Sequence, residues 1–170
     1  MILPLVLEPQ PILRRKATPV ATITAEIQKL IDDMIETMYA APGVGLAANQ
    51  VSSPLDLFVA SPDGKQGKEI VLINAVLSDR RGRHRSPEGC LSLPGISAEV
   101  TRTTQVTASG LDRRGRPVKI SADGLLAKIF QHETDHLSGK LYIDHLTPWK
   151  RFDLLEKYKK GGDPEEEGRA

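Results

Sequence analysis

The stretch that decides the fold is QHETDHLSG, residues 131–139. At its centre is the pattern His-Glu-x-x-His, in which His132 and His136 are four residues apart and therefore lie on one face of a helix. On that face both imidazoles can bind one metal ion, with Glu133 beside them. A catalytic zinc-type centre needs a third protein ligand and one position open for water. The pattern therefore predicts a metal-bearing helix, and its third ligand must come from elsewhere in the chain.

An apolar stripe extends the histidine face toward the start of this helix. Leu125 and Ile129 precede the histidines at steps of four and three residues, so all four side chains share one side. The helix is expected to begin near Asp123 or Gly124 and to run to Ser138, ending at Gly139. The two apolar residues fit ordinary core packing as well as they fit the lining of a pocket for a hydrophobic side chain.

The candidate third ligand is Cys90, within EGCLSLP at residues 88–94. It is the only cysteine, which excludes an intrachain disulfide. A free cysteine is most often a small buried hydrophobe. Together with the two histidines, however, it completes a Cys-His-His set that leaves one position for water. Glu133 cannot easily bind the same ion and is expected to act as general base on that water.

Other candidates for chemistry are weaker. GVGLAANQ, residues 43–50, lacks the Lys and Ser/Thr of a phosphate loop, and its small residues indicate a backbone that lies close to a ligand or to another element. Gln50 is either a plain loop residue or an amide donor to an oxyanion. Asp135 is expected to face solvent, or else to orient a ligand histidine. Solvated surface positions are expected for His84 and His145.

The remaining elements predict an α+β fold, in which the central metal-bearing helix packs against antiparallel β-sheets. An amphipathic N-terminal helix starts at an N-cap, Thr24, and ends before Pro42. Val, Ile and Thr are frequent in four expected strands: residues 55–60, 69–77, 98–109 and 117–121. A hairpin loop at residues 110–116 joins the last two strands. A short C-terminal helix is expected at residues 148–160, followed by a disordered polar tail, GGDPEEEGRA.

Charge and composition limit the function classes. The 170 residues fit a single domain, and the net charge of +1 argues against a strong nucleic-acid footprint. Asp-Arg-Arg-Gly-Arg occurs at residues 79–83 and 112–116, and both copies are expected to be solvated turns. The N-terminus lacks the features of a signal peptide, and no apolar run is long enough to span a membrane, so a cytoplasmic protein is expected.

Taken together and in order, GVGLAANQ, EGCLSLP and QHETDHLSG resemble the signature blocks of the peptide deformylase family. The resemblance covers roughly residues 1–148, the expected catalytic domain, and leaves residues 149–170 as the C-terminal helix and tail. It implies hydrolysis of the N-formyl group from the N-terminal formyl-methionine of newly synthesised polypeptides, with release of formate.

The resemblance also implies roles for individual residues. One divalent metal ion would be Fe2+ in the cell, with Zn2+ or Ni2+ in preparations, and its ligands would be Cys90, His132 and His136. Glu133 would transfer protons, while Gln50 and the backbone N–H of Leu91 would stabilise the oxyanion. The methionine side chain and the extended substrate backbone would contact Val44, Gly45, Leu125 and Ile129.

The implied partners are nascent N-formyl-Met peptides, with no membrane and no specific DNA. A transient ribosome contact through the C-terminal helix would suit its basic residues, although a plain surface helix is an equal alternative. Two other functions remain open from the residues alone. One is a metal-dependent endopeptidase of the His-Glu-x-x-His type. The other is a non-catalytic metal-stabilised binding module, which would normally need a fourth protein ligand.

Overall fold

The histidine-bearing helix, α2 (Gly124–Leu137), packs on a five-stranded sheet and also contacts a separate two-stranded one. The structure is a computed structural model, and residues 1–162 are described. All strand pairs are antiparallel, which confirms the predicted α+β arrangement of a central helix against antiparallel sheets.

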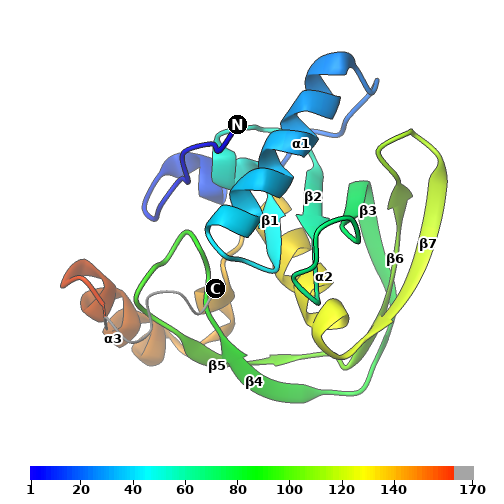
Figure 1. The fold of residues 1–170 in the computed structure, drawn as a ribbon. Helices are drawn as coiled ribbons and strands as arrows, with labels where there is room; N and C mark the ends of the chain where they lie inside the picture. Colours follow the sequence, from blue (N-terminus) through cyan, green and yellow to red (C-terminus); the bar gives the residue numbers. More distant parts are fainter. Residues whose placement is uncertain (163–170) are drawn as a thin grey trace.

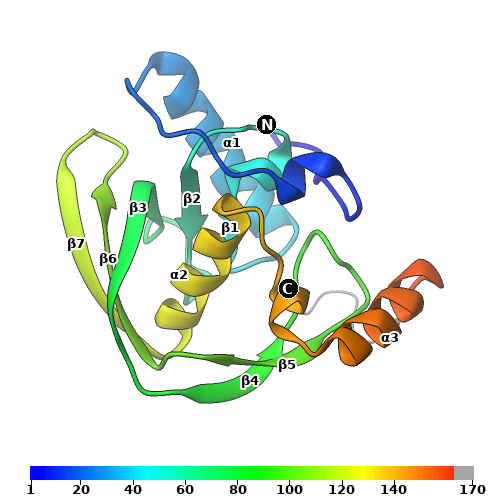
Figure 2. The same cartoon turned by 180° about the vertical axis from the view of Figure 1, so that it is seen from behind.

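The chain passes directly from the larger sheet into the smaller one. The larger sheet has the order β1-β2-β3-β6-β7 and the smaller one pairs β4 with β5. In Figure 1 and, from behind, in Figure 2, β3 bends away and continues as β4, so that the β4–β5 sheet passes below α2. The strands are β1 (Gly45–Ala47), β2 (Leu57–Ala60), β3 (Ile70–Arg81), β4 (His84–Glu88), β5 (Ala98–Arg102), β6 (Gln105–Leu111) and β7 (Pro117–Asp123).

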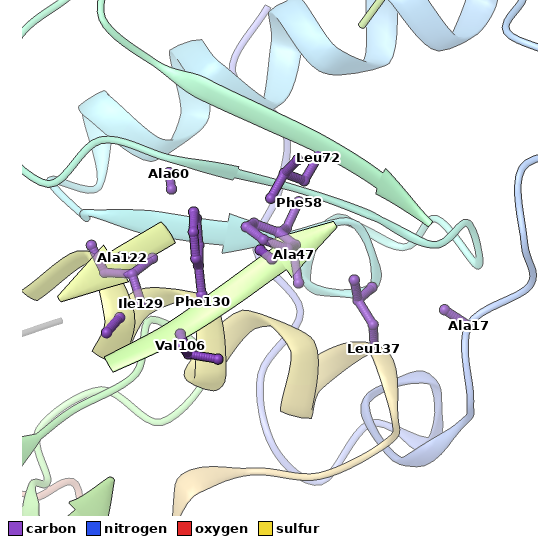
Figure 3. Close-up of a cluster of buried hydrophobic side chains, with 12 residues drawn as sticks. Ala17, Ala47, Phe58, Ala60, Leu72, Val106, Ala122, Ile129, Phe130 and Leu137 are labelled. Atoms are coloured by element: carbon purple, nitrogen blue, oxygen red, sulfur yellow. The ribbon is translucent and has the colours of Figure 1, made fainter. Parts of the chain in front are cut away.

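Strand β2 is buried on both faces because a helix covers each side of the sheet. Side chains alternate along a strand, so Leu57 and Val59 join the apolar cluster of α1 (Ala25–Ala40), while Phe58 joins that of α2. The ring of Phe58 meets Phe130 of α2 edge-on, with centroids 5.8 Å apart (Figure 3). This packing fixes α2, and therefore both histidines, against the sheet.

Helix ends follow from the local sequence. The Thr24 hydroxyl accepts a hydrogen bond from the Ile27 N–H at the start of α1. Gly139, just beyond α2, has φ +78°, and a Cβ there would lie 2.5 Å from the carbonyl oxygen of Arg14. Only glycine fits at this position, which explains the last residue of the QHETDHLSG stretch.

The prediction of one strand over residues 98–109 is wrong. The chain changes sheets there, because β5 ends at Arg102 and β6 begins at Gln105. The side chain of Gln131 takes the place of a neighbouring strand: its Oε1 accepts from the Thr103 N–H at 2.9 Å, and its Nε2 donates to the Thr103 carbonyl at 2.9 Å. A helix side chain thus satisfies the backbone where the strand is interrupted.

Several shorter elements were not predicted. They are β1 and the 3₁₀ helix Ala48–Val51 within GVGLAANQ, two more 3₁₀ helices, Pro11–Arg14 and Tyr142–His145, and β4, whose proline and charged residues give no strand pattern. Helix α3 spans Pro148–Lys159. In the described part of the chain, no helix has the length and apolar character needed to cross a membrane. Most of the predicted disordered tail, residues 163–170, lies outside the described residues.

Candidate metal centre and active site

The three predicted metal ligands come together. Cys90 Sγ lies 3.2 Å from His136 Nε2, and the two Nε2 atoms of His132 and His136 are 3.3 Å apart. The histidines come from successive turns of α2, while the cysteine follows β4 at the end of the smaller sheet. All three ligand atoms lie within 4.8 Å of one another.

The donor set fits a divalent metal ion. Nδ1 of His132 lies 2.9 Å from Glu88 Oε1, and a carboxylate can only accept, so this nitrogen carries the proton and leaves Nε2 free to bind a metal. Burial lowers the pKa of His136, which keeps its ring neutral and able to act as a ligand. One thiolate and two imidazoles match a site that keeps a further coordination position open.

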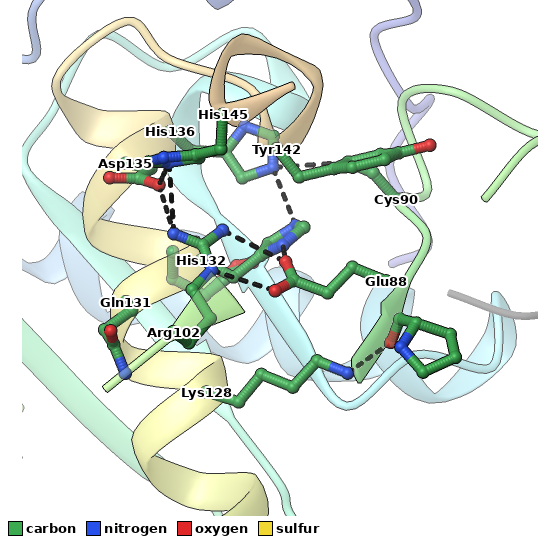
Figure 4. Close-up of polar contacts among 12 residues, drawn as sticks. Glu88, Cys90, Arg102, Lys128, Gln131, His132, Asp135, His136, Tyr142 and His145 are labelled. Carbon is green, nitrogen blue, oxygen red and sulfur yellow. Dashed lines mark hydrogen bonds and ion pairs between the residues drawn. The ribbon is translucent and has the colours of Figure 1, made fainter. Parts of the chain in front are cut away.

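Glu88, which the sequence did not single out, links His132 to a buried arginine. Arg102 donates to both carboxylate oxygens of Glu88, from Nε at 2.8 Å and from Nη2 at 3.0 Å. Burial alone would raise the pKa of Glu88, but the hydrogen bonds from His132 and Arg102 outweigh it and lower the pKa to about 2. Glu88 is therefore a carboxylate at neutral pH, and Figure 4 shows it between the ring and the guanidinium.

The preferred prediction that Asp135 faces solvent was wrong, whereas His145 is exposed as predicted. Asp135 Oδ2 accepts from Arg102 Nη1 at 2.6 Å and from His145 Nε2 at 2.7 Å, so neither residue is merely solvated. Asp135 does not orient a ligand histidine directly either, because its bonds go to the arginine. His84 is likewise exposed as expected. This network could not be predicted from the sequence, because β5 brings Arg102 to the helix only in the folded chain.

Glu133 lies next to the cluster and is almost fully buried. Its Oε1 is 3.9 Å from His132 Nε2, and its Oε2 has no hydrogen-bond partner among residues 1–162. Burial raises the pKa of Glu133 to about 7, against the lowering effect of the His132 ring. Gly45 of β1 leaves the space for this side chain: a Cβ there would lie 3.1 Å from Glu133 Cγ and Cδ.

Gln50 is held with its amide nitrogen toward the cysteine. Its Oε1 accepts from the Ala47 N–H at 3.0 Å, while its Nε2 is 3.1 Å from Ser92 Oγ and 3.6 Å from Cys90 Sγ. Among residues 1–162 the backbone N–H of Leu91 has no hydrogen-bond partner. The structure therefore places both predicted oxyanion donors beside the metal ligands, and their roles stay predictions.

A cavity of about 270 Å³ opens beside these residues. Its lining includes all four residues predicted to contact the substrate, with Ile129 buried and Leu125 nearly half exposed at the mouth. Lys128, which was not predicted, also lines the cavity, and its Nζ donates to the carbonyl of Pro87 across the gap between α2 and β4 (Figure 4). The full lining is Val44, Gly45, Gln50, Pro87, Glu88, Gly89, Cys90, Leu91, Ser97, Leu125, Lys128, Ile129, His132 and Glu133.

Known proteins resemble this chain over most of its length. The peptide deformylase of Nitrosococcus oceani is 47% identical over 152 residues, which cover 89% of this chain and 91% of the relative. The peptide deformylase of Dehalococcoides mccartyi is 51% identical over 139 residues, covering 81% and 82% of the two chains.

Solved structures agree. A crystal structure of a peptide deformylase from Legionella pneumophila matches with a TM-score of 0.92 and 42% identity, covering 95% of each chain. One from Synechococcus elongatus in complex with actinonin matches with a TM-score of 0.88 and 38% identity, covering 96% of this chain and 90% of that one. These likenesses do not favour an endopeptidase or a binding module. The family model described as polypeptide deformylase matches residues 2–152, and the chain therefore belongs to that family.

Proposed function

We infer that this chain removes the formyl group from the N-terminal formyl-methionine of newly synthesised polypeptides and releases formate. The observation that carries this inference is the convergence of Cys90, His132 and His136 beside Glu133, at one end of a largely apolar cavity. Family membership supports the same reaction. Nascent chains are made in the cytoplasm, and we propose that the protein acts there.

In the reaction, the residues of the chain would move protons and stabilise charge. A divalent metal held by Cys90, His132 and His136 would supply the positive charge that activates water at neutral pH. Glu133 lies 3.9 Å from the metal-binding nitrogen of His132 and has an unpartnered oxygen among residues 1–162, so it would take the proton from the attacking water and later deliver one to the departing amine. The N–H groups of Gln50 and Leu91 would donate to the oxyanion that forms on the formyl carbon.

The cavity explains how such a site can spare ordinary peptide bonds. The formyl carbon carries only hydrogen beyond its carbonyl and nitrogen, so a tight site can exclude bulkier acyl groups by size. Val44, Leu125 and Ile129 offer apolar surface for the methionine side chain. Gly45, in the short edge strand β1, can present its backbone to an extended substrate.

Formate release tests the proposal. The protein should release formate from formyl-Met-Ala-Ser and should leave an unformylated protein substrate intact. Cleavage of internal peptide bonds without formate release would instead support the endopeptidase alternative.

We propose Fe2+ as the metal in the cell, with Zn2+ or Ni2+ binding in some preparations. The thiolate of Cys90 and ferrous iron are both oxidisable, so activity of iron-loaded protein should decay in air. Metal analysis of protein purified without oxygen tests the identity of the ion. Full activity of iron-loaded protein after prolonged exposure to air would contradict this assignment.

We also propose a transient ribosome contact through α3. Its outer surface carries exposed aromatic rings, with Trp149 74% and Phe152 59% exposed, beside the exposed Lys150. Aromatic and basic side chains together suit an RNA surface. Deleting residues 149–170 should reduce co-sedimentation with ribosomes, and unchanged co-sedimentation would remove the proposal.

A further inference from the structure

The string Asp-Arg-Arg-Gly-Arg has different surroundings in its two copies. In the second basic turn (Asp112–Arg116), Arg113 Nη2 lies 2.7 Å from Asp32 of α1, and Arg116 Nε lies 2.9 Å from Asp112. Asp112 also accepts from the backbone N–H groups of Arg114 and Arg116. The residues of this copy therefore build the hairpin turn and attach it to α1.

The first copy, here called the first basic turn (Asp79–Arg83), has no comparable side-chain contacts. The prediction of a turn was wrong for its first three residues, which end β3, and holds only for Gly82 and Arg83. The first basic turn lies where β3 ends and the chain enters β4, and all five of its residues are exposed. Among residues 1–162, Arg80, Arg81 and Arg83 have no carboxylate within 4.0 Å. Asp79 and Asp123 line one shallow groove with Arg81 but form no ion pair with it. Three guanidinium groups are thus left free in a chain whose total charge is only +1.

The two copies lie at opposite ends of the long strands. Arg81 pairs with Gln105 at the start of β6, whereas the second turn follows Leu111 at the end of β6. From the first turn, β4 and β5 run toward α3 (Figure 1, Figure 2). Arg85 and Glu99 of these strands line one groove with Lys150 of α3. Arg85, two residues beyond the first turn, therefore lies between that turn and α3.

We propose that the first basic turn binds the phosphates of single-stranded RNA, as a contact separate from α3. Arg80 and Arg81 end β3, and Arg83 follows after Gly82, which has φ +70°. The three arginines therefore lie within about 11 Å along the chain, a density of positive charge that suits a polyanion with one charge per nucleotide. Guanidinium groups bind phosphate oxygens in a bidentate manner. The choice of RNA rather than an acidic peptide rests on the proposed function, because nascent chains emerge beside ribosomal RNA.

The test uses a fluorescein-labelled 20-nucleotide RNA of mixed sequence, with fluorescence anisotropy recorded over a range of salt concentrations. The test variant is R80S/R81S/R83S. The matched control is R113S/R114S/R116S, which removes the same three charges from the identical string. Because that control loses ion pairs to Asp32 and Asp112, a second control, K65S/K68S/R114S, removes three exposed cations whose side chains form no ion pair among residues 1–162. Thermal unfolding establishes that each variant is folded.

The test variant should bind RNA at least roughly ten-fold more weakly in low salt. Its slope of log affinity against log salt should be shallower by about 2, since single strands contribute about 0.7 per neutralised phosphate. The folded controls should stay within about two-fold of the original protein. Equal weakening in test and control variants would overturn the proposal, as would stronger competition by poly-glutamate than by unlabelled RNA. Formate release from formyl-Met-Ala-Ser is measured in parallel: release without RNA binding refutes only the RNA contact, whereas absent release refutes the proposed function itself.

Discussion

His132 is oriented by a chain of side chains that reaches the protein surface. Glu88 accepts from its Nδ1, Arg102 holds both oxygens of Glu88, and Asp135 and His145 hold Arg102 from the outer side. Partners of this kind fix the tautomer and the orientation of a metal-binding ring. The spacing of the two histidines could be recognised from the sequence because helix periodicity dictates it. Glu88 and Arg102 could not, since their contact depends on the pairing of β4 with β5.

We expect Glu88→Gln to weaken metal affinity about 10- to 100-fold. The substitution removes the negative charge that holds the His132 Nδ1 proton and leaves the buried Arg102 with one carboxylate partner fewer. Competition with a chelator measures the change. Glu99→Gln is the control, because Glu99 pairs with Arg85 where both side chains are more than half exposed. Equal metal loss in both variants would mean that the network does not support His132.

Asp56 provides a prediction away from the metal site. Burial raises the pKa of Asp56 in the folded state above the ordinary value of 3.8. The folded state therefore favours the protonated carboxyl group. As the pH rises from about 3.8 through the raised pKa, the protein loses stability because the buried group must become charged. We expect Asp56→Asn to stabilise the protein at pH 7 and to make little difference at pH 3. Urea unfolding at the two pH values measures this. A variant that is less stable at pH 7 than the original protein would contradict it.

At the scale of elements, the site depends on how closely β1 approaches α2. A Cβ on Gly45 would lie 2.9 Å from Ile129 Cγ2 and 3.1 Å from Glu133, both on α2. The small residues of GVGLAANQ predicted that the backbone lies close to some other group. They could not predict that this group belongs to α2, because nothing in the local sequence reveals which element packs there. The prediction of one strand over residues 98–109 was wrong for a related reason. The backbone at the break between β5 and β6 is hydrogen-bonded by Gln131, which lies far away in the sequence.

Gly45→Ala should therefore displace Glu133 and narrow the cavity. We expect kcat/KM to fall about 100-fold, the size of effect expected when a reacting group is misplaced by about 1 Å. Metal content should stay unchanged, because none of the three metal ligands is among the nearest neighbours of the added Cβ. Kinetics with a formyl-Met peptide and metal analysis of the same sample decide the matter. Retained activity would contradict this prediction, because it would show that β1 and α2 can accommodate the added methyl group without displacing Glu133.

At the scale of the whole molecule, α3 is attached to the rest of the chain by few contacts. None of its residues is fully buried, but Leu154, Leu155 and Tyr158 pack on the third apolar cluster, around Leu93 and Tyr142. The Tyr158 hydroxyl donates to the carbonyl of Glu8 at 2.8 Å. We propose that residues 1–148 form the catalytic domain and that α3 adds stability without supplying catalytic groups.

Removing residues 149–170 should leave a folded, active protein. Losing the contacts of three partly buried side chains costs about 2 kcal/mol, which lowers the Tm of a chain of this size by about 4–8 °C. Calorimetry and formate release measure the two effects. An unfolded or inactive truncated protein would show that the catalytic domain extends beyond residue 148.

The most direct test of the account is the effect of Glu133→Gln on formate release, with metal content measured in the same sample. Glutamine keeps the size of the side chain but cannot take the proton from water. We expect formate release to fall by about 10²- to 10⁴-fold, while the metal stays bound by Cys90, His132 and His136. Near-normal formate release by the metal-loaded variant would contradict the role of Glu133 and, with it, the proposed mechanism.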